Sequence, residues 1–224
     1  MKLYYAKVLF ACVNVLLFAG KAIAVPIGSL AVGQKSGDLS LDFGINFEMI
    51  NVSPNKQRLP ETNMTSKGFT ALLRYDPVSE LSIFADGGFS DIWLSNPSFK
   101  GYMGGAFGGG VRLSLPDPHR SRFTVNISAD VYNIQSGNSN QTAQYLEYEG
   151  AILGAVKNAN TILYGGLNGS NVNLSFPGIT YNSTYNVGAV FGMDQFINPY
   201  LFFNFEAHMF DKQSIEGSIG YTFF

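Results

Sequence analysis

Apolar and polar residues alternate one by one along most of this chain. From Phe123 to Val131 every odd-numbered position is apolar, and the residues between them, among them Asn126 and Asp130, are polar. A period of two places the two sets on opposite faces of an extended strand. The pattern recurs over residues 39–49 and 201–209. The chain is therefore predicted to consist of β-strands that each carry one apolar face.

Ten runs of this kind are predicted, and the segments between them differ in character. Turn-forming pairs such as Asp76-Pro77 and Asn198-Pro199 follow some runs. Longer polar segments, expected to be loops, follow others: 51–66, 136–143 and 175–182. Short turns at one end and longer loops at the other are typical of transmembrane barrels. The ten runs are 39–50, 67–76, 80–94, 100–115, 122–135, 144–157, 161–174, 183–195, 199–210 and 214–224.

We therefore expect an all-β fold, a closed antiparallel up-and-down transmembrane β-barrel of ten strands. The run 161–174 fits either register, because Ile162-Leu163-Tyr164 and Gly165-Gly166 do not alternate. If this run or the run 39–50 is not a strand, eight strands are the alternative.

The charged residues favour a membrane barrel over a soluble sheet. In the runs with a clear register, the apolar face carries no charge between the strand ends, as expected for contact with lipid. A soluble β-sandwich also buries one face of each strand and stays open as an alternative. The opposite face would line the barrel interior, where the predicted polar network consists of Asp42, Glu48, Arg74, Asp86, Arg112, Asp130, Glu147, Glu149, Asp194, Glu206, His208 and Glu216.

The composition agrees with such a barrel. Only 13% of the 224 residues are charged, against about 25% in a typical soluble domain. The mean hydropathy of +0.09 is too low for a bundle of membrane helices. A net charge of −2 and a single cysteine argue against a nucleic-acid partner, a disulfide scaffold and a zinc module. No metal-ligand spacing and no cofactor motif is found.

Residues 1–24 are predicted to be a cleaved signal peptide, which leaves residues 25–224 as the barrel domain. Two lysines are followed by the apolar stretch Val8–Gly20 and by the small-residue cleavage site Ala22-Ile23-Ala24. Cleavage removes three lysines and no acid, so the formal net charge falls from −2 to −5. The only cysteine, Cys12, is removed as well. We expect an exported protein without disulfides.

The end of the chain alternates and finishes on aromatic side chains. Ile219, Tyr221 and Phe223 share the apolar face, and Phe224 is the last residue. This end resembles the C-terminal targeting strand of bacterial outer-membrane β-barrel proteins, and the chain resembles the small OmpA-like and opacity-type surface barrels of Gram-negative bacteria. The resemblance implies location in the outer membrane, insertion by the barrel-assembly machinery and both termini in the periplasm. We expect a monomer in the lipid bilayer.

The predicted interior is acidic. Nine inward acids face Arg74 and Arg112, with His208 as a further partner. Charges in a narrow barrel must pair, form hydrogen bonds or be neutralised by protons. A water-filled acidic lumen would favour cations, whereas a filled lumen would be a rigid plug. Small barrels are mostly filled.

Three functions are compatible with these residues. The favoured one is a non-enzymatic surface, structural or adhesin-like role, with the loops as interaction surface. The second is a narrow cation-preferring pore. The third is a hydrolase at the outer rim, with His208 as the base, Glu206 beside it on the same face and Ser214 on the next run.

Basic residues near the predicted outer rim are candidates for binding lipopolysaccharide. Such cations would lie at the level of the headgroups and contact their phosphates. These residues are Lys56, Arg58, Lys67, Lys100 and Lys212.

Overall fold

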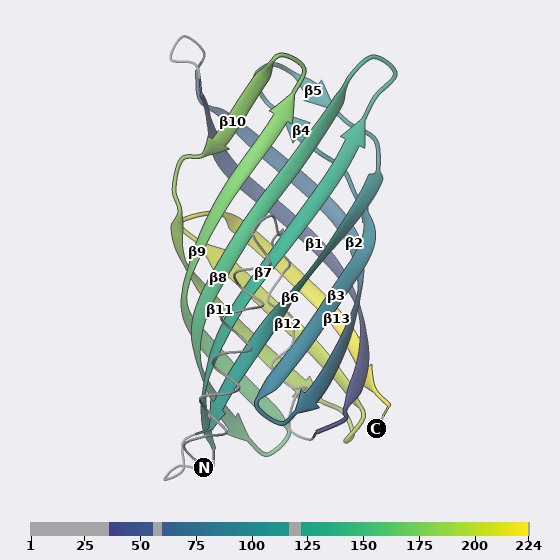
Figure 1. Cartoon of the computed structure of the whole chain (residues 1–224), viewed down its shortest axis with the longest axis vertical. Coiled ribbons are helices and arrows are strands. Elements are labelled where there is room, and N and C mark those ends of the chain that lie inside the picture. The colour runs from purple at the N-terminus through teal and green to yellow at the C-terminus, as the bar shows by residue number, and fades with distance from the viewer. Residues whose placement is uncertain (1–35, 56–59, 117–121, 224) are drawn as a thin grey trace.

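The computed structural model describes residues 36–55, 60–116 and 122–223, which form one 13-stranded antiparallel sheet closed into a barrel (Figure 1). Within these ranges no helix is long and apolar enough to cross a membrane. The strands are β1 (Leu39–Pro54), β2 (Thr62–Val78), β3 (Leu81–Ser90), β4 (Trp93–Leu94), β5 (Phe99–Lys100), β6 (Gly104–Pro116), β7 (Phe123–Gly137), β8 (Thr142–Asn158), β9 (Thr161–Phe176), β10 (Ile179–Ser183), β11 (Val187–Phe196), β12 (Leu201–Met209) and β13 (Gln213–Thr222).

Ten of these strands form the ring at the end of the barrel that holds Leu39 and Thr222, called here the near end. The order is β1, β2, β3, β6, β7, β8, β9, β11, β12 and β13, and β13 pairs back with β1. Phe43 of β1 lies opposite Ile219 of β13 in this closing pair. The prediction of a closed ten-stranded up-and-down barrel is confirmed. The uncertain run 161–174 is a regular strand, with Tyr164 buried and Leu163 exposed.

The opposite end, called here the far end, has a different ring. The short strand β10 pairs with β1 and β9, so it replaces β11, β12 and β13, which end lower in the wall (Figure 1). The β4–β5 hairpin pairs with β2 through Trp93 and Thr65, and Tyr102 bridges to Gly137 of β7. In the described chain the far end is therefore formed by β1, β2, β4, β5, β7, β8, β9 and β10, and the Tyr102–Gly137 bridge, not a strand pairing, joins the β4–β5 segment to β7.

Most of the segments predicted as long loops continue the strands. Strand β1 runs to Pro54 and β2 begins at Thr62, while only residues 138–141 separate β7 from β8. A two-residue turn joins β9 to β10, with Gly178 at a φ of 80°, a conformation that glycine adopts without strain. The prediction of long loops is wrong here because Asn, Ser and Thr, which are common in loops, also suit the outer face of a strand in water.

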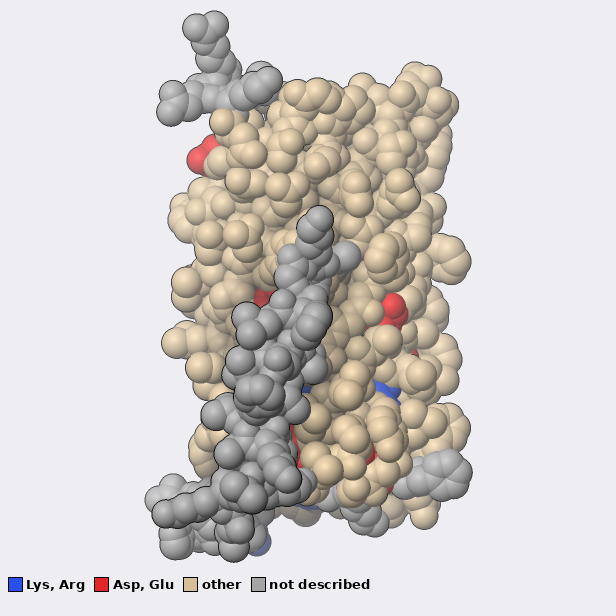
Figure 2. All heavy atoms as spheres, in the orientation of Figure 1, with Lys and Arg blue, Asp and Glu red and all other residues tan. Residues whose placement is uncertain are grey.

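The outer wall changes from apolar to polar along the strands. On β9 the outward residues Leu163 and Leu167 are 57% and 66% exposed, and further along the same face Asn171 and Asn173 follow. Strand β8 has 17 residues, whereas a transmembrane strand needs about 9–11. The barrel therefore extends beyond the membrane at its far end. Figure 2 shows very few charged side chains on the visible wall.

The inner wall changes in the opposite sense. Midway along β9 inward residues such as Asn168 and Ser170 are polar, whereas toward the far end Val172 and Leu174 are apolar and fully buried. Apolar side chains thus fill the far end of the lumen. The expectation of a polar interior along the whole barrel is corrected, since the far part has an apolar core and a polar exterior, as a soluble barrel does. The apolar cluster to which Val172 and Leu174 belong extends from the far end down to Leu72 and to Phe84, which lies opposite Arg74. It comprises Ile50, Val52, Met64, Leu72, Phe84, Ile92, Leu94, Phe99, Ala106, Tyr132, Ile134, Ala143, Tyr145, Val172, Leu174, Phe176 and Tyr181. A second, smaller apolar cluster fills part of the near end and comprises Ala151, Leu153, Ala155, Ile162, Tyr164, Val190 and Phe202.

The apolar part of the outer wall is called here the apolar belt. Aromatic side chains mark its boundary at the near end. Tyr200 and Tyr221 stack at 6.1 Å between ring centres, and Phe223 packs edge-on against Tyr221 at 5.3 Å. Aromatic girdles of this kind occur where a barrel wall meets the headgroups. Ile219, Tyr221 and Phe223 all face outward, 40–45% exposed. Phe224 and the predicted signal peptide 1–24 lie outside the described residues.

The belt predicts a sharp contrast between two positions on one face of β9. Replacing Leu167 with Arg should lower the free energy of unfolding in lipid vesicles by about 2 kcal/mol, because the charge would face hydrocarbon. Asn171→Arg, four residues along the same face, should change it by less than about 0.5 kcal/mol. Denaturant titration of both variants measures the difference. Equal effects would contradict the boundary drawn between these residues.

Candidate functional site

The structure places all twelve predicted network residues inside the barrel. Each is buried, with at most 9% of its surface exposed. Three further charged residues, outside the predicted network, are also buried: Asp76, Asp211 and Lys212. The interior is therefore richer in charge than expected, and it contains a lysine.

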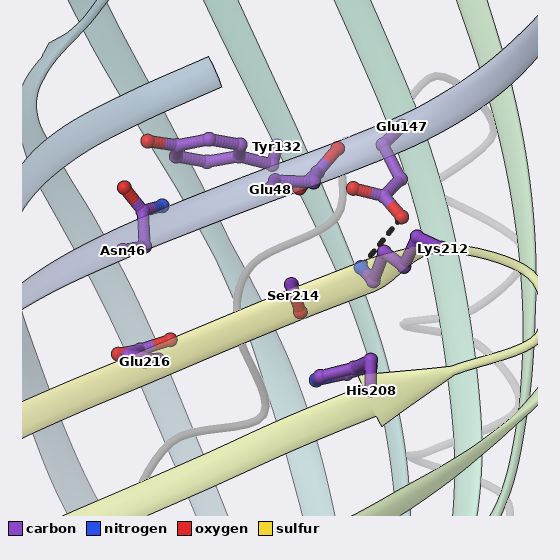
Figure 3. Close-up of a pocket in the computed structure, with 8 residues that line it drawn as sticks. All are labelled: Asn46, Glu48, Tyr132, Glu147, His208, Lys212, Ser214 and Glu216. Atoms are coloured by element: carbon purple, nitrogen blue, oxygen red, sulfur yellow. Dashed lines mark hydrogen bonds and ion pairs between the residues drawn. The ribbon is translucent and has the colours of Figure 1, made fainter. Parts of the chain in front are cut away.

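Lys212 is the principal cation of the acidic region. Its Nζ lies 2.7 Å from Glu147 Oε1 (Figure 3). It also lies 2.6 Å from Glu149 Oε2. The predicted position of Lys212 at the outer rim, in contact with lipopolysaccharide, is wrong, because the side chain is buried. The β12–β13 hairpin ends part-way up the wall, so its loop residue reaches the lumen instead of the rim (Figure 1).

The conformation of the same loop explains the inward turn. Phe210 has a φ of 82° and is 76% exposed on the outside, whereas the next residue, Asp211, is 2% exposed. Asp211 accepts hydrogen bonds from Asn168 at 2.6 Å and from Ser170 at 2.9 Å. A side chain at Gly188 would overlap the Asp211 carboxylate. Glycine at this position therefore leaves room for the loop inside the barrel.

A phenol connects two of the carboxyl groups. The Tyr145 hydroxyl lies 2.7 Å from Glu48 Oε1 and 2.7 Å from Glu147 Oε2. The phenol thus bridges Glu48 of β1 and Glu147 of β8 across the lumen.

The network continues toward the near end through His208. Its Nε2 lies 2.8 Å from Glu206 Oε1, and its Nδ1 lies 3.5 Å from Glu149 Oε1. Tyr164 donates to the other oxygen of Glu206 at 2.9 Å. Asn204 then links the Tyr164 hydroxyl to Asp194, at 2.8 and 2.7 Å. These contacts form a nearly continuous chain of polar groups through the lumen.

The two arginines belong to the near half of this network. Arg74 and Arg112 are the largest of the fully buried side chains. Strand register places Asp42 and Asp130 on neighbouring strands, two residues diagonally from Arg74 and Arg112 respectively. The Arg112 guanidinium also lies 6.0 Å from the centre of the Phe84 ring. The lumen is thus arranged with arginines toward the near end and Lys212 with His208 in the middle.

A small cavity remains between these groups. Its volume is about 20 Å³, which is room for about one water molecule. In the described residues no group of three His, Cys, Asp or Glu is arranged to hold a metal ion. Figure 3 shows the side chains around the cavity, which are Asn46, Glu48, Tyr132, Glu147, His208, Lys212, Ser214 and Glu216.

The three residues proposed for a rim hydrolase do lie together. His208 contacts Glu206, and strand register pairs it with Ser214 of β13. They do not lie at the rim, however, because His208 and Glu206 are 4% and 0% exposed beneath the apolar core. The predicted location of this hydrolase site at the outer rim is therefore wrong.

The remaining predicted lipid contacts are on the outer wall or outside the described residues. Lys67 and Lys100 are exposed and lie near the Trp93 ring, with distances of 5.3 and 5.2 Å from each Nζ to the ring centre. Lys56 and Arg58 lie outside the described residues.

Known barrels of the outer membrane share this architecture. An outer-membrane channel from Pseudomonas putida F1 superposes with a TM-score of 0.52 at 11% identity, covering 91% of this chain and 98% of that chain. The fold is that of an outer-membrane β-barrel. At this identity the similarity concerns the fold alone, and it agrees with the expected resemblance to small outer-membrane barrels.

Other outer-membrane barrels superpose less well. The translocator domain of the autotransporter NalP from Neisseria meningitidis gives a TM-score of 0.46 at 11% identity, over 86% of this chain and 91% of that chain. Ail, the attachment invasion locus protein of Yersinia pestis, gives 0.33 at 12% identity, over 84% and 99%. No protein-family model and no curated protein sequence matches this barrel.

Removal of the Lys212 charge should destabilise the barrel strongly. Lys212→Met leaves Glu147 and Glu149 buried without their cation, and we expect the free energy of unfolding to fall by about 3–5 kcal/mol. Lys100→Met, on the outer wall, is the matched control and should have little effect in detergent. Combining Lys212→Met with Glu147→Gln and Glu149→Gln should recover most of the loss. A triple variant no more stable than Lys212→Met would refute the ion-pair explanation.

Proposed function

We propose that this protein is a closed, non-conducting outer-membrane barrel with a non-enzymatic surface role, structural or adhesin-like. The observation that carries the proposal is the filling of the lumen. A hydrogen-bonded charge network occupies its middle, and the apolar core of the far end lies above it. On this proposal the protein is exported by its signal peptide and acts through the outer surface of its far end.

The burial of inward side chains argues against the cation-preferring pore. In an open channel water would contact the residues that line it. Here Arg74, Arg112, Leu153 and Phe202 are at most 1% exposed, although they point inward from different strands. Three of the lumen acids, Glu147, Glu149 and Glu206, pair with Lys212 and His208.

The dimensions of the cavity argue against the hydrolase. Pockets for small molecules measure about 300–1,000 Å³, far more than the 20 Å³ beside His208 and Ser214. A lipid or peptide substrate would need the apolar core to move before it could reach these residues. A histidine and a glutamate in a structural network account for the geometry without catalysis.

The far end offers the surface for such a role. Its outer wall carries polar side chains that remain in regular strands, such as Asn171 and Asn173 on β9, and an apolar core supports them from within. A rigid wall of this kind presents side chains at fixed positions, which reduces the entropic cost of binding a partner. The adhesin-like role is therefore proposed for this wall rather than for long mobile loops.

Adjacent residues on β9 provide a direct test for a filled lumen. In a Cys12→Ser chain we expect Asn171→Cys to react rapidly with a charged, membrane-impermeant thiol reagent, since its side chain is exposed. Ser170→Cys, 3% exposed and inward, should react at least about a hundredfold more slowly, because reaction requires local opening of the wall. Planar-bilayer recordings of the unmodified protein should show no stable open state. Fast labelling of Ser170→Cys together with cation-selective conductance would favour the pore.

A further inference from the structure

Two lysines flank the single tryptophan of the chain on the outer wall. The Nζ atoms of Lys67 and Lys100 lie 5.3 and 5.2 Å from the centre of the Trp93 ring, and Lys67 Nζ also lies 5.8 Å from the Phe47 ring. Strand register places Trp93 between Thr65 of β2 and Lys100 of β5. The three side chains therefore come from three neighbouring strands and form one outward cluster.

The cluster lies at the far boundary of the apolar belt. On β2, Lys67 lies eight residues from Tyr75 in the direction of the far end. The Tyr75 side chain is 48% exposed near the opposite boundary of the belt. This separation is about 26 Å of strand, or about 20 Å along the barrel axis at a tilt of about 40°. Beyond Lys67 the next outward residues of β2 are Thr65 and Asn63. The apolar band of a barrel is about 25 Å tall, so the ammonium groups reach the level of the lipid headgroups.

No protein group neutralises these two cations in the described part of the chain. Neither lysine has a carboxylate within ion-pair distance there, whereas Lys212 has two. The nearby Asp91 accepts a hydrogen bond from the backbone N–H of Lys67 at 2.7 Å. An ammonium group at the edge of a lipid-facing wall favours an anionic partner, and aromatic rings such as Trp93 favour the same interface.

We propose that Lys67, Trp93 and Lys100 form a binding site for the phosphate of an anionic lipid in the outer leaflet. The ammonium groups donate charge-assisted hydrogen bonds to the phosphate oxygens, and the Trp93 and Phe47 rings contact the apolar part of the same lipid. The occupant is a phosphorylated lipid rather than free phosphate, because the site opens toward the hydrocarbon region. This site is independent of whether the lumen conducts.

Trp93 is the only tryptophan, so its fluorescence reports directly on the site. The purified barrel in mixed micelles is titrated with brominated phosphatidic acid, which quenches tryptophan on contact, and with brominated phosphatidylcholine as the neutral comparison. We expect saturable quenching at lower mole fraction of phosphatidic acid. In the Lys67→Gln, Lys100→Gln double variant the half-saturating mole fraction should rise about tenfold, as expected for loss of charge-assisted hydrogen bonds.

A matched control lies at the other end of the barrel. Lys157 Nζ is 5.9 Å from the Phe196 ring, so Lys157→Gln removes a lysine beside an aromatic ring far from Trp93 and should leave the quenching curve unchanged. The heat-dependent mobility of each variant verifies folding. Equal quenching by the two brominated lipids, or an unchanged curve for the folded double variant, would overturn the proposal. Displacement of phosphatidic acid by inorganic phosphate at similar concentration would identify a free-anion site and overturn the assignment to lipid.

Discussion

Closure of the sheet along β1 is the constraint on which the rest of the structure depends. Lipid offers no hydrogen bonds to the backbone, so a sheet that spans a membrane must pair its first strand with its last. Strand β1 meets β13 in its near part and β10 in its far part, and it pairs with β2 throughout. Because the partner changes part-way along β1, the barrel has ten strands at one end and fewer at the other.

The change of ring places Lys212 in the lumen. Strands β12 and β13 end where β10 takes over beside β1, so the loop between them lies in the wall and not at the rim. Its side chains turn inward and supply the positive charge that Glu147 and Glu149 need. The lower number of strands at the far end and the pairing of the buried charges therefore both result from the same arrangement of β10, β12 and β13.

The sequence predicts the near half well because lipid imposes a simple rule on it. Outward positions must be apolar there, so the alternation reveals both the strands and the inward acids, such as Glu147 and Glu206. In the far half water replaces lipid, and the apolar residues of the same strands change from the outer face to the inner face. On β9, for example, the apolar residue Leu167 points outward, whereas Val172 points inward. A switch in the phase of alternation is visible in the sequence at that point and could have predicted the apolar core. The burial of Lys212 could not be predicted, because it depends on where β12 and β13 end relative to β10.

The lysines show how height in the wall decides what a charge contacts. Lys212 is at the level where the wall faces hydrocarbon, and only the inside of the barrel offers it anions. Lys67 and Lys100 are at the level where the outward face becomes polar, and there the side chains can remain outside, against an aromatic ring. A cation in the belt that pointed outward would lose its hydration without a partner. The inward orientation of Lys212 and the outward orientation of Lys67 and Lys100 thus follow from the same energetic cost of burying an unpaired charge.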